Sequence, residues 1–311
     1  MRAMNRVMSL ATAALMLLGN LDDPAGSSPI EHGRTRGIEL RNSKIVISGD
    51  GAKGGSGDGY VLKRPCWYEP GLSAAEMLKS QESLRDYWFR FTKNPTEEKF
   101  QKFLKQFKDK VSEDGRWWGP AYDASDPKGE ACFAGLDPFV FVPPGTTPPA
   151  GITIQELAEI ARAALTVPEP TVKLSPDAKS YVNLPTWVWL ENVGETRRSV
   201  TAEIPGVMSV TVVATLEKIK IDPGTTKERA EVHEEGCGTS GKPYAKGAAF
   251  TCGVRYLRAS IDQPREAYTL TVTTSWPVRA EGNVVPFQFA PVEVGTTRDV
   301  PVGEIQSNVK P

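Results

Sequence analysis

Two glycine-rich segments have the spacing of loops that bind phosphate groups in other proteins. Residues 49–54 read G-x-G-x-x-G after the apolar run KIVIS, but GSGDG follows, where a dinucleotide-binding fold needs a helix. Residues 236–243, GCGTSGKP, approach the P-loop pattern, but Pro243 stands where a hydroxyl residue would bind Mg²⁺. We therefore expect neither a nucleotide nor another cofactor, and interpret the segments as a flexible leader and a loop.

Carboxylates near tryptophans could act on a carbohydrate. Glycoside hydrolysis needs two carboxyl groups about 5–10 Å apart and no histidine, and the chain has only His32 and His233. The aspartates that lie near the pair Trp117 and Trp118 in sequence are Asp114, Asp123, Asp126 and Asp137. If two of them faced one cleft, the protein would be a secreted hydrolase or carbohydrate-active protein, which is our alternative function.

Two aromatic pairs are candidates for stacking on a ligand. They are Trp67 with Tyr68, beside Cys66, and Trp117 with Trp118. The competing interpretation is that these rings pack against a disulfide bond.

Other signatures of catalysis do not occur in the sequence. Residues 231–235, EVHEE, are not the zinc motif H-E-x-x-H, and there is no G-x-S-x-G elbow for a nucleophile. We assign no catalytic, cofactor-binding or metal-binding residue, and we favour a protein that is not an enzyme.

The first residues predict the compartment. Arg2 and Arg6 precede an apolar run over residues 7–19, which has the length of a secretory signal and is short for a membrane span. We therefore expect residues 1–27 to be a signal peptide and the protein to be secreted or on the cell surface. A membrane would be a partner only if this segment stays uncleaved; a buried N-terminal helix is the alternative.

The cysteines support export. They are Cys66, Cys132, Cys237 and Cys252. An even count in an exported chain indicates disulfide bonds, and four cysteines allow three pairings. Because Cys66–Cys132 and Cys237–Cys252 each stay within one predicted part of the chain, we predict these two pairs. Buried free thiols are the alternative.

The elements that must position these residues fall into two parts. After a glycine-rich leader over residues 28–60, with at most one short strand at 44–48, we expect a helical module over residues 61–147. Its helices begin at SAAE (73–76) and NPTE (94–97), which are capping signals.

The second part is rich in strands. The segment VPPGTTPPAG (142–151) is a linker, and a capping signal at Thr153 begins one helix that ends near Leu165. Short Val/Thr-rich strands follow, without helical crossovers between them, which is typical of an antiparallel sandwich. We therefore predict an α+β, mainly β fold, in which residues 148–311 form a helix and an immunoglobulin-like β-sandwich.

Charge excludes one class of partner. The chain has 311 residues, 37 Lys+Arg and 38 Asp+Glu, for a net charge of −1. Nucleic-acid binders carry a strongly basic surface, so we expect no nucleic acid as a partner.

Several segments carry a family resemblance. They are PCWYEPG (65–71), RWWGP (116–120), FVFVPPG (139–145), residues 152–191 and GKPYAKGAAFTCGVRYLRAS (241–260). Over residues 60–308 the chain resembles secreted proteins of unknown function that are common in actinomycetes. The resemblance implies export and an immunoglobulin-like C-terminal half, and it supplies no catalytic residues.

These observations together predict an exported, non-catalytic structural or interaction protein. Its expected partner is a cell-wall component or a cell-surface protein.

Overall fold

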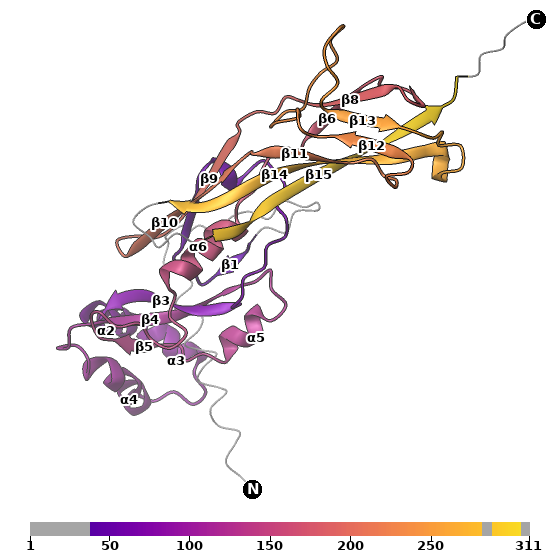
Figure 1. Cartoon of the computed structure of the whole chain (residues 1–311). Helices are drawn as coiled ribbons and strands as arrows, with labels where there is room; N and C mark the ends of the chain where they lie inside the picture. Colours follow the sequence, from indigo (N-terminus) through magenta and orange to yellow (C-terminus); the bar gives the residue numbers. More distant parts are fainter. Residues whose placement is uncertain (1–37, 282–287, 306–311) are drawn as a thin grey trace, which may run out of the picture.

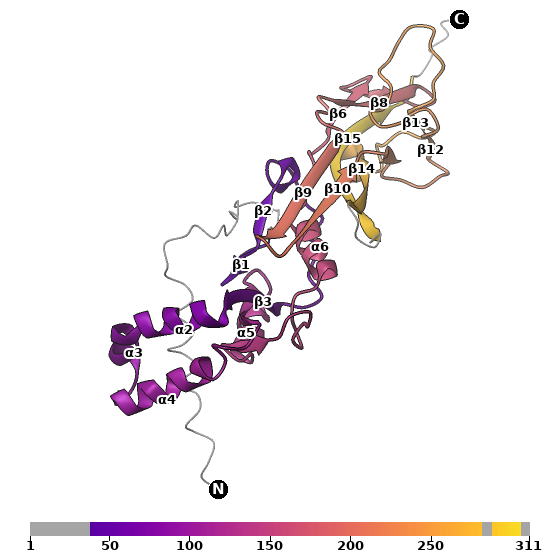
Figure 2. The same cartoon turned by 90° about the vertical axis from the view of Figure 1, so that its left-hand side faces the viewer.

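The computed structural model describes residues 38–281 and 288–305, so the predicted signal peptide lies outside the described residues. The chain is elongated, with helices at one end and a long β region at the other (Figures 1 and 2). Strands dominate and their sheets are almost entirely antiparallel. The prediction of a mainly β chain is therefore confirmed. Within the described ranges, no helix is both long and apolar enough to cross a membrane.

The N-terminal region, residues 61–147, supplies three strands of a four-stranded sheet that the sequence did not predict, and the fourth comes from residues 40–41. Strand β4 (Arg116–Asp123) pairs with β3 (Cys66–Ser73), and also with the short strands β1 (Leu40–Arg41) and β5 (Val140–Val142). Strands β3 and β4 both contain glycine and proline, which normally mark turns. This region is therefore mixed α/β rather than purely helical.

Helices cover one part of this sheet. They are α2 (Ala74–Ser83), α3 (Arg85–Phe91), α4 (Glu97–Lys108) and the short α5 (Gly129–Ala134). Helix α2 begins at the predicted capping box, in which the Ser73 side chain accepts from the Glu76 amide. Phe100, Leu104 and Phe107 of α4 are buried in one aromatic core with Trp88 and Trp117.

The segment predicted as a loose leader belongs to the core. Strand β2 (Val46–Ser48) pairs with β9 (Arg197–Ile204), and Ile45 is 1% exposed. The 3₁₀ turn η2 (Asp50–Ala52) is held by the Asp50 carboxylate, which accepts from the Ser199 amide at 2.8 Å. The prediction of a flexible leader is therefore wrong for residues 38–60. The strands β1 and β2 and the turn η2 each bond to elements that are distant in the sequence.

The centre of the molecule is one helix on a sheet. Helix α6 (Ile154–Ala163) packs against β9 and β10 (Met208–Thr215). It starts at the capping box predicted at Thr153. Its buried face joins the N-terminal sheet and the central sheet in one hydrophobic core.

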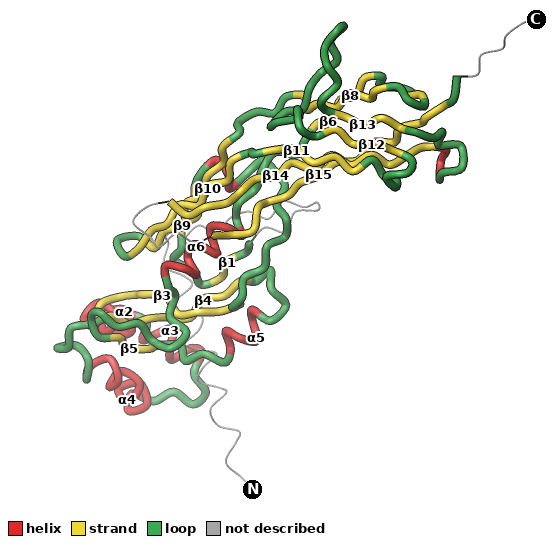
Figure 3. The backbone as a smooth tube through the Cα atoms, in the orientation of Figure 1, coloured by secondary structure: helices red, strands yellow, loops and turns green. Residues whose placement is uncertain are grey.

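A long hairpin forms the rest of the central sheet. Strands β14 (Ala267–Glu281) and β15 (Gln288–Gly303) run along most of the β region, as the yellow tube in Figure 3 shows. Strand β10 pairs with the end of β14, and β11 (Lys218–Asp222) pairs with its middle. The strand β7 (Ser180–Tyr181) adds a short parallel pair to β15.

A second antiparallel sheet faces the half of this hairpin in which β14 begins and β15 ends. Its order is β12 (Ala230–His233), β13 (Gly253–Tyr256), β8 (Pro185–Glu191) and β6 (Thr171–Ser175). The two sheets enclose a hydrophobic core that includes Val188 and Leu270.

Both predicted disulfide bonds are present. Cys66–Cys132 joins β3 to α5, with a Cα–Cα distance of 5.8 Å. Cys237 and Cys252 are 15 residues apart in the sequence, and their Cα atoms are 4.8 Å apart. The predicted pairing is confirmed, and none of the cysteines is free.

Candidate functional site

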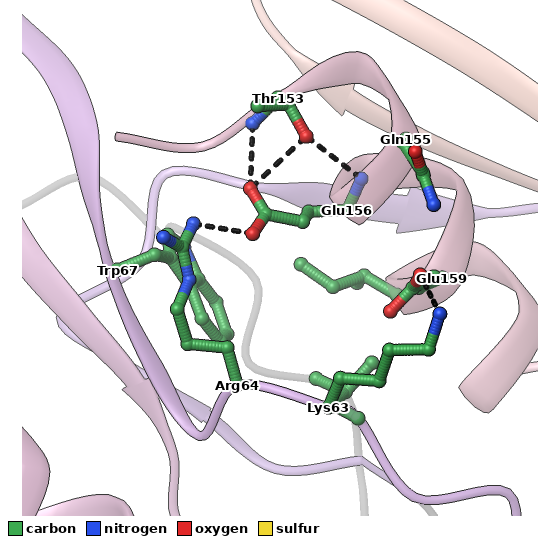
Figure 4. Close-up of a pocket in the computed structure, with 9 residues that line it drawn as sticks. Lys63, Arg64, Trp67, Thr153, Gln155, Glu156 and Glu159 are labelled. Carbon is green, nitrogen blue, oxygen red and sulfur yellow. Dashed lines mark hydrogen bonds and ion pairs between the residues drawn. The ribbon is translucent and has the colours of Figure 1, made fainter. Parts of the chain in front are cut away.

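A cavity lined by both charged and apolar side chains lies where the N-terminal region meets helix α6. It has a volume of about 220 Å³ (Figure 4). One wall is the chain from Leu62 to Trp67 and the other is the first turns of α6. Its polar lining comes from Lys63, Arg64, Thr153, Gln155, Glu156 and Glu159, and its apolar lining from Leu62, Trp67 and Ile160.

Helix geometry places the acidic residues of the cavity on one face. Glu156, Glu159 and Arg162 follow one another at intervals of three residues, so their side chains lie on adjacent turns. Residues 58–64 run beside this face and supply a partner for each of the three. The ion pairs are Arg64–Glu156 at 2.5 Å, Lys63–Glu159 at 3.3 Å and Asp58–Arg162 at 2.5 Å.

The Glu156 carboxylate has three donor contacts. Its carboxylate accepts from the Thr153 amide at 2.9 Å and from the Thr153 hydroxyl at 3.1 Å, besides pairing with Arg64. These contacts are the capping box that starts α6. Glu156 therefore fixes the end of the helix and the position of Arg64.

Glu159 is in the opposite situation. Its residue is only 6% exposed, and it accepts no hydrogen bond from the residues that the structure describes. Lys63 is its ion-pair partner, and the Lys63 side chain is 74% exposed. A buried carboxylate normally has several donors, whereas Glu159 has one ion-pair partner and oxygens that are not fully shielded from solvent.

Arg162 holds residues 58–60 against helix α6. It is 1% exposed, donates to Asp58 Oδ1 at 3.1 Å, and lies 5.0 Å from the centre of the Tyr60 ring. Burial, with Glu159 nearby, raises the pKa of Tyr60 above its ordinary value. Arg162 therefore acts as a structural anchor that holds one edge of the cavity.

A second buried carboxylate, Glu69, lies in the N-terminal sheet. It is 3% exposed and accepts three hydrogen bonds, from Trp67 Nε1 at 2.8 Å, the Ser43 hydroxyl at 2.7 Å and the Lys44 amide at 2.6 Å. Burial raises the pKa of Glu69, and these donors oppose the shift. Partial desolvation lowers the pKa of Lys44, although this residue is exposed and Glu69 opposes the shift. Because its donors are present, Glu69 ties residues 43–45 to β3.

The residues predicted to stack on a ligand are all in the core. Trp67, Tyr68, Trp117 and Trp118 are 3%, 5%, 4% and 7% exposed. The prediction that they offer an open ring face is therefore wrong, because both faces of the sheet are covered. Neighbours on a strand point to opposite faces, and Trp117 lies in the aromatic core beneath the helices while Trp118 lies in the core shared with α6. Only Trp67 reaches a cavity, where its side chain forms part of the wall behind Arg64 (Figure 4).

The four candidate aspartates serve turns or lie apart. Asp123 accepts from the Ser125 amide at 2.9 Å, and Asp126 accepts from the Lys128 amide at 2.7 Å. Asp114 precedes β4, whereas Asp137 follows α5. None of the four lines the cavity at α6 or a wider hollow of about 660 Å³ beside the β14–β15 hairpin.

The glycine motifs are turns and loops in the structure. Gly51 lies in η2, where a Cβ atom would come within 2.7 Å of the Leu165 side chain. Gly241, in the loop closed by Cys237–Cys252, packs against the backbone of Trp189. Across the described part of the chain, no group of three or more His, Cys, Asp or Glu side chains could hold a metal ion.

Sequence reasoning missed the cavity residues Lys63, Arg64 and Glu159. The capping signal at Thr153 located α6, but the missed clue is the charged row Glu156, Glu159 and Arg162 on an otherwise apolar helix. Buried charges of this kind require partners.

Comparison of the chain with protein-family models, with curated proteins and with solved structures gives no match.

Proposed function

We propose that this chain is exported and works outside the cytoplasm as a non-catalytic structural or interaction protein. The observation that carries the proposal is the pair of disulfide bonds, Cys66–Cys132 and Cys237–Cys252, one in each end of the molecule. Disulfide bonds persist in oxidising compartments and are rare in the cytosol. The apolar segment over residues 7–19 is the export signal in this proposal.

The placement of the reactive side chains favours binding over catalysis. Asp123 and Asp126 cap turns, and Glu156 caps a helix. Arg162 and Glu69 hold loops to the core. Each of these groups has a structural partner, so its chemistry is used within the fold.

We further propose that the β region is an immunoglobulin-like sandwich and that the chain belongs with the secreted actinomycete proteins it resembles. Two antiparallel sheets face each other across one core. The hydroxyl of Tyr268, at the start of β14, donates to the carbonyls of Arg258 and Ala259, each at 3.1 Å. Corner tyrosines of immunoglobulin-like domains make a similar bond to upstream backbone.

In this proposal the elongated shape separates two binding ends. The helices α2 to α4 form one end, and the loops between β8, β12 and β13 form the other (Figure 2). One end would contact the cell wall or a surface protein of the producing cell, and the other would extend away from it.

Cell fractionation combined with a thiol count tests the proposal. We expect the chain in the envelope or medium fraction, with no thiol reacting before reduction and four reacting after it. Crosslinking on intact cells followed by purification should then retain a cell-wall component or a surface protein. Reduced protein found in the cytoplasm would contradict export, and the absence of any crosslinked partner would contradict the interaction role.

A further inference from the structure

The cavity at α6 is lined by a carboxylate that has a single charged partner. Glu159 is 6% exposed and lines the cavity, yet among the described residues it accepts no hydrogen bond. Its ion-pair partner, Lys63, is 3.3 Å away on a side chain that is 74% exposed. Lys63 therefore holds its ammonium at Glu159 only weakly, because an ion pair with an exposed partner contributes little.

The rest of the cavity has the shape and chemistry for an apolar body next to that carboxylate. Leu62, Trp67 and Ile160 supply apolar lining, and the space is about 220 Å³. Figure 4 shows the Lys63–Glu159 pair and the Arg64–Glu156 pair as two separate contacts between α6 and the chain that runs beside it. The volume of the cavity is large enough for a short alkyl chain beside Glu159.

The other ion pair of the cavity, Arg64–Glu156, is held by further contacts within the chain. Arg64 is 2.5 Å from Glu156 and also donates to the Gly151 carbonyl at 3.1 Å. Glu156 in turn is occupied by the Thr153 capping box. Of the two carboxylates in the cavity, Glu159 is thus the one with fewer partners.

We propose that this cavity binds an alkylammonium group, whose nitrogen donates to Glu159 while its carbon chain lies against the apolar wall. The group would come from a free small amine or from a lysine side chain of another protein. Lys63 already presents an ammonium to Glu159, so the ligand takes its place and Lys63 turns to solvent. This inference goes beyond the proposed function and does not depend on export.

Isothermal titration calorimetry on the full, oxidised chain tests the site with three probes. They are n-butylammonium chloride, Nα-acetyl-lysine amide and the neutral n-butanol. We expect the two ammonium probes to bind at least about tenfold more tightly than n-butanol, because the alcohol can donate to Glu159 but carries no positive charge, so the charge-assisted pairing is lost. Tighter binding of the lysine amide would identify a protein lysine as the source, and tighter binding of butylammonium would identify a free amine. Equal affinity for n-butanol would overturn the proposal.

Two substitutions locate the binding. Glu159→Gln should lower the affinity for butylammonium at least about tenfold, whereas Glu98→Gln, which removes an exposed carboxylate on α4, should leave it unchanged. Lys63→Met should raise the affinity several-fold, because the competing ammonium is gone.

The Lys63 variant keeps the test valid if Glu159→Gln does not fold. Its side chain is 74% exposed, so circular dichroism should show an unchanged fold. Binding that is retained in folded Glu159→Gln, or that is unaltered in Lys63→Met, would overturn the proposal. A chain found in the cytoplasm would contradict the proposed function and leave this result intact.

Discussion

The two ends of the molecule are both closed by a disulfide bond, but they are stabilised in different ways. In the N-terminal region Cys66–Cys132 spans 66 residues and encloses α2, α3 and α4. In the β region Cys237–Cys252 spans 15 residues and closes one loop beside β13. The first bond constrains a whole subdomain, and the second constrains a single connection.

The hydrophobic cores of the two ends also differ in the kind of side chain that fills them. The N-terminal core depends on a few large rings, with Phe107 lying 4.8 Å from Trp117 and 5.3 Å from Phe139 between ring centres. The core between the two sheets consists mainly of aliphatic side chains, spread along the hairpin β14–β15. A single truncation should therefore affect the N-terminal region more than the β region.

The largest difference is expected from core truncations. Phe107→Ala removes a ring that is 0% exposed and should lower the free energy of unfolding by about 5 kcal/mol. Leu270→Ala, at a side chain that is 1% exposed between the two sheets, should lower it by about 3 kcal/mol.

Urea unfolding with hydrogen exchange measures both effects. In Phe107→Ala we expect amide protection to fall in α4 while β14 and β15 keep theirs. A simultaneous loss of protection in both regions would show that the two ends unfold as one unit, and the comparison would fail.

Removing each disulfide bond should give a somewhat smaller effect. In the chain-entropy model, Cys66→Ser with Cys132→Ser costs about 4 kcal/mol, and Cys237→Ser with Cys252→Ser costs about 3 kcal/mol. The second double variant should leave the N-terminal region folded, because its closed loop lies wholly within the β region.

Thermal unfolding followed by tryptophan fluorescence checks this order, with the oxidised wild-type chain as reference. A larger loss from the Cys237 and Cys252 variant than from the Cys66 and Cys132 variant would show that loop length does not decide the stabilisation.

Local signals in the sequence were sufficient for some elements. The capping boxes at Ser73 and Thr153 predicted the starts of α2 and α6, because a cap depends only on residues three positions apart. The cysteine pairs were also predictable, because each stays within one part of the chain.

Long-range pairing could not be predicted in the same way. Strands β3 and β4 carry Pro70 and Pro120, and their pairing joins residues about fifty positions apart in the sequence. The short strand expected at residues 44–48 is present as β2, but its pairing with β9, far away in the sequence, had no local signal. The site at Glu159 was missed because its partner Lys63 lies in a segment without regular structure.

Helix caps offer a smaller test at both α2 and α6. Ser73→Ala and Thr153→Ala each remove a hydroxyl that accepts from the amide of the third helical residue, and each should cost about 1 kcal/mol. Ser112→Ala, in the exposed turn after α4, should stay within about 0.5 kcal/mol of wild type. Denaturant unfolding measures all three, and a cost at Ser112 equal to that at the caps would contradict the capping explanation.

The smallest expected effect is an opposite response of the two ends to pH. Burial raises the pKa of Glu69 above its ordinary 4.5, so the folded N-terminal region keeps a proton that the unfolded chain releases. The stability due to Glu69 is therefore full below pH 4.5 and is lost as pH rises through the folded pKa. In the β region, hydrogen bonds from Arg229 lower the pKa of Asp262 below 3.8. Its contribution is present above pH 3.8 and is lost as pH falls through the folded pKa.

Thermal unfolding between pH 3 and 7 separates the two contributions. Glu69→Gln should flatten the decline in Tm as pH rises from about 4.5, and Asp262→Asn should flatten the loss of Tm on acidification below about 3.8. We expect shifts of only about one or two degrees, since each variant changes one group in a large chain. If Glu69→Gln instead made the decline toward neutral pH steeper, the carboxyl group would have a lowered pKa in the folded state. Its three donors would then outweigh its burial, and the two ends would respond to acid in the same direction.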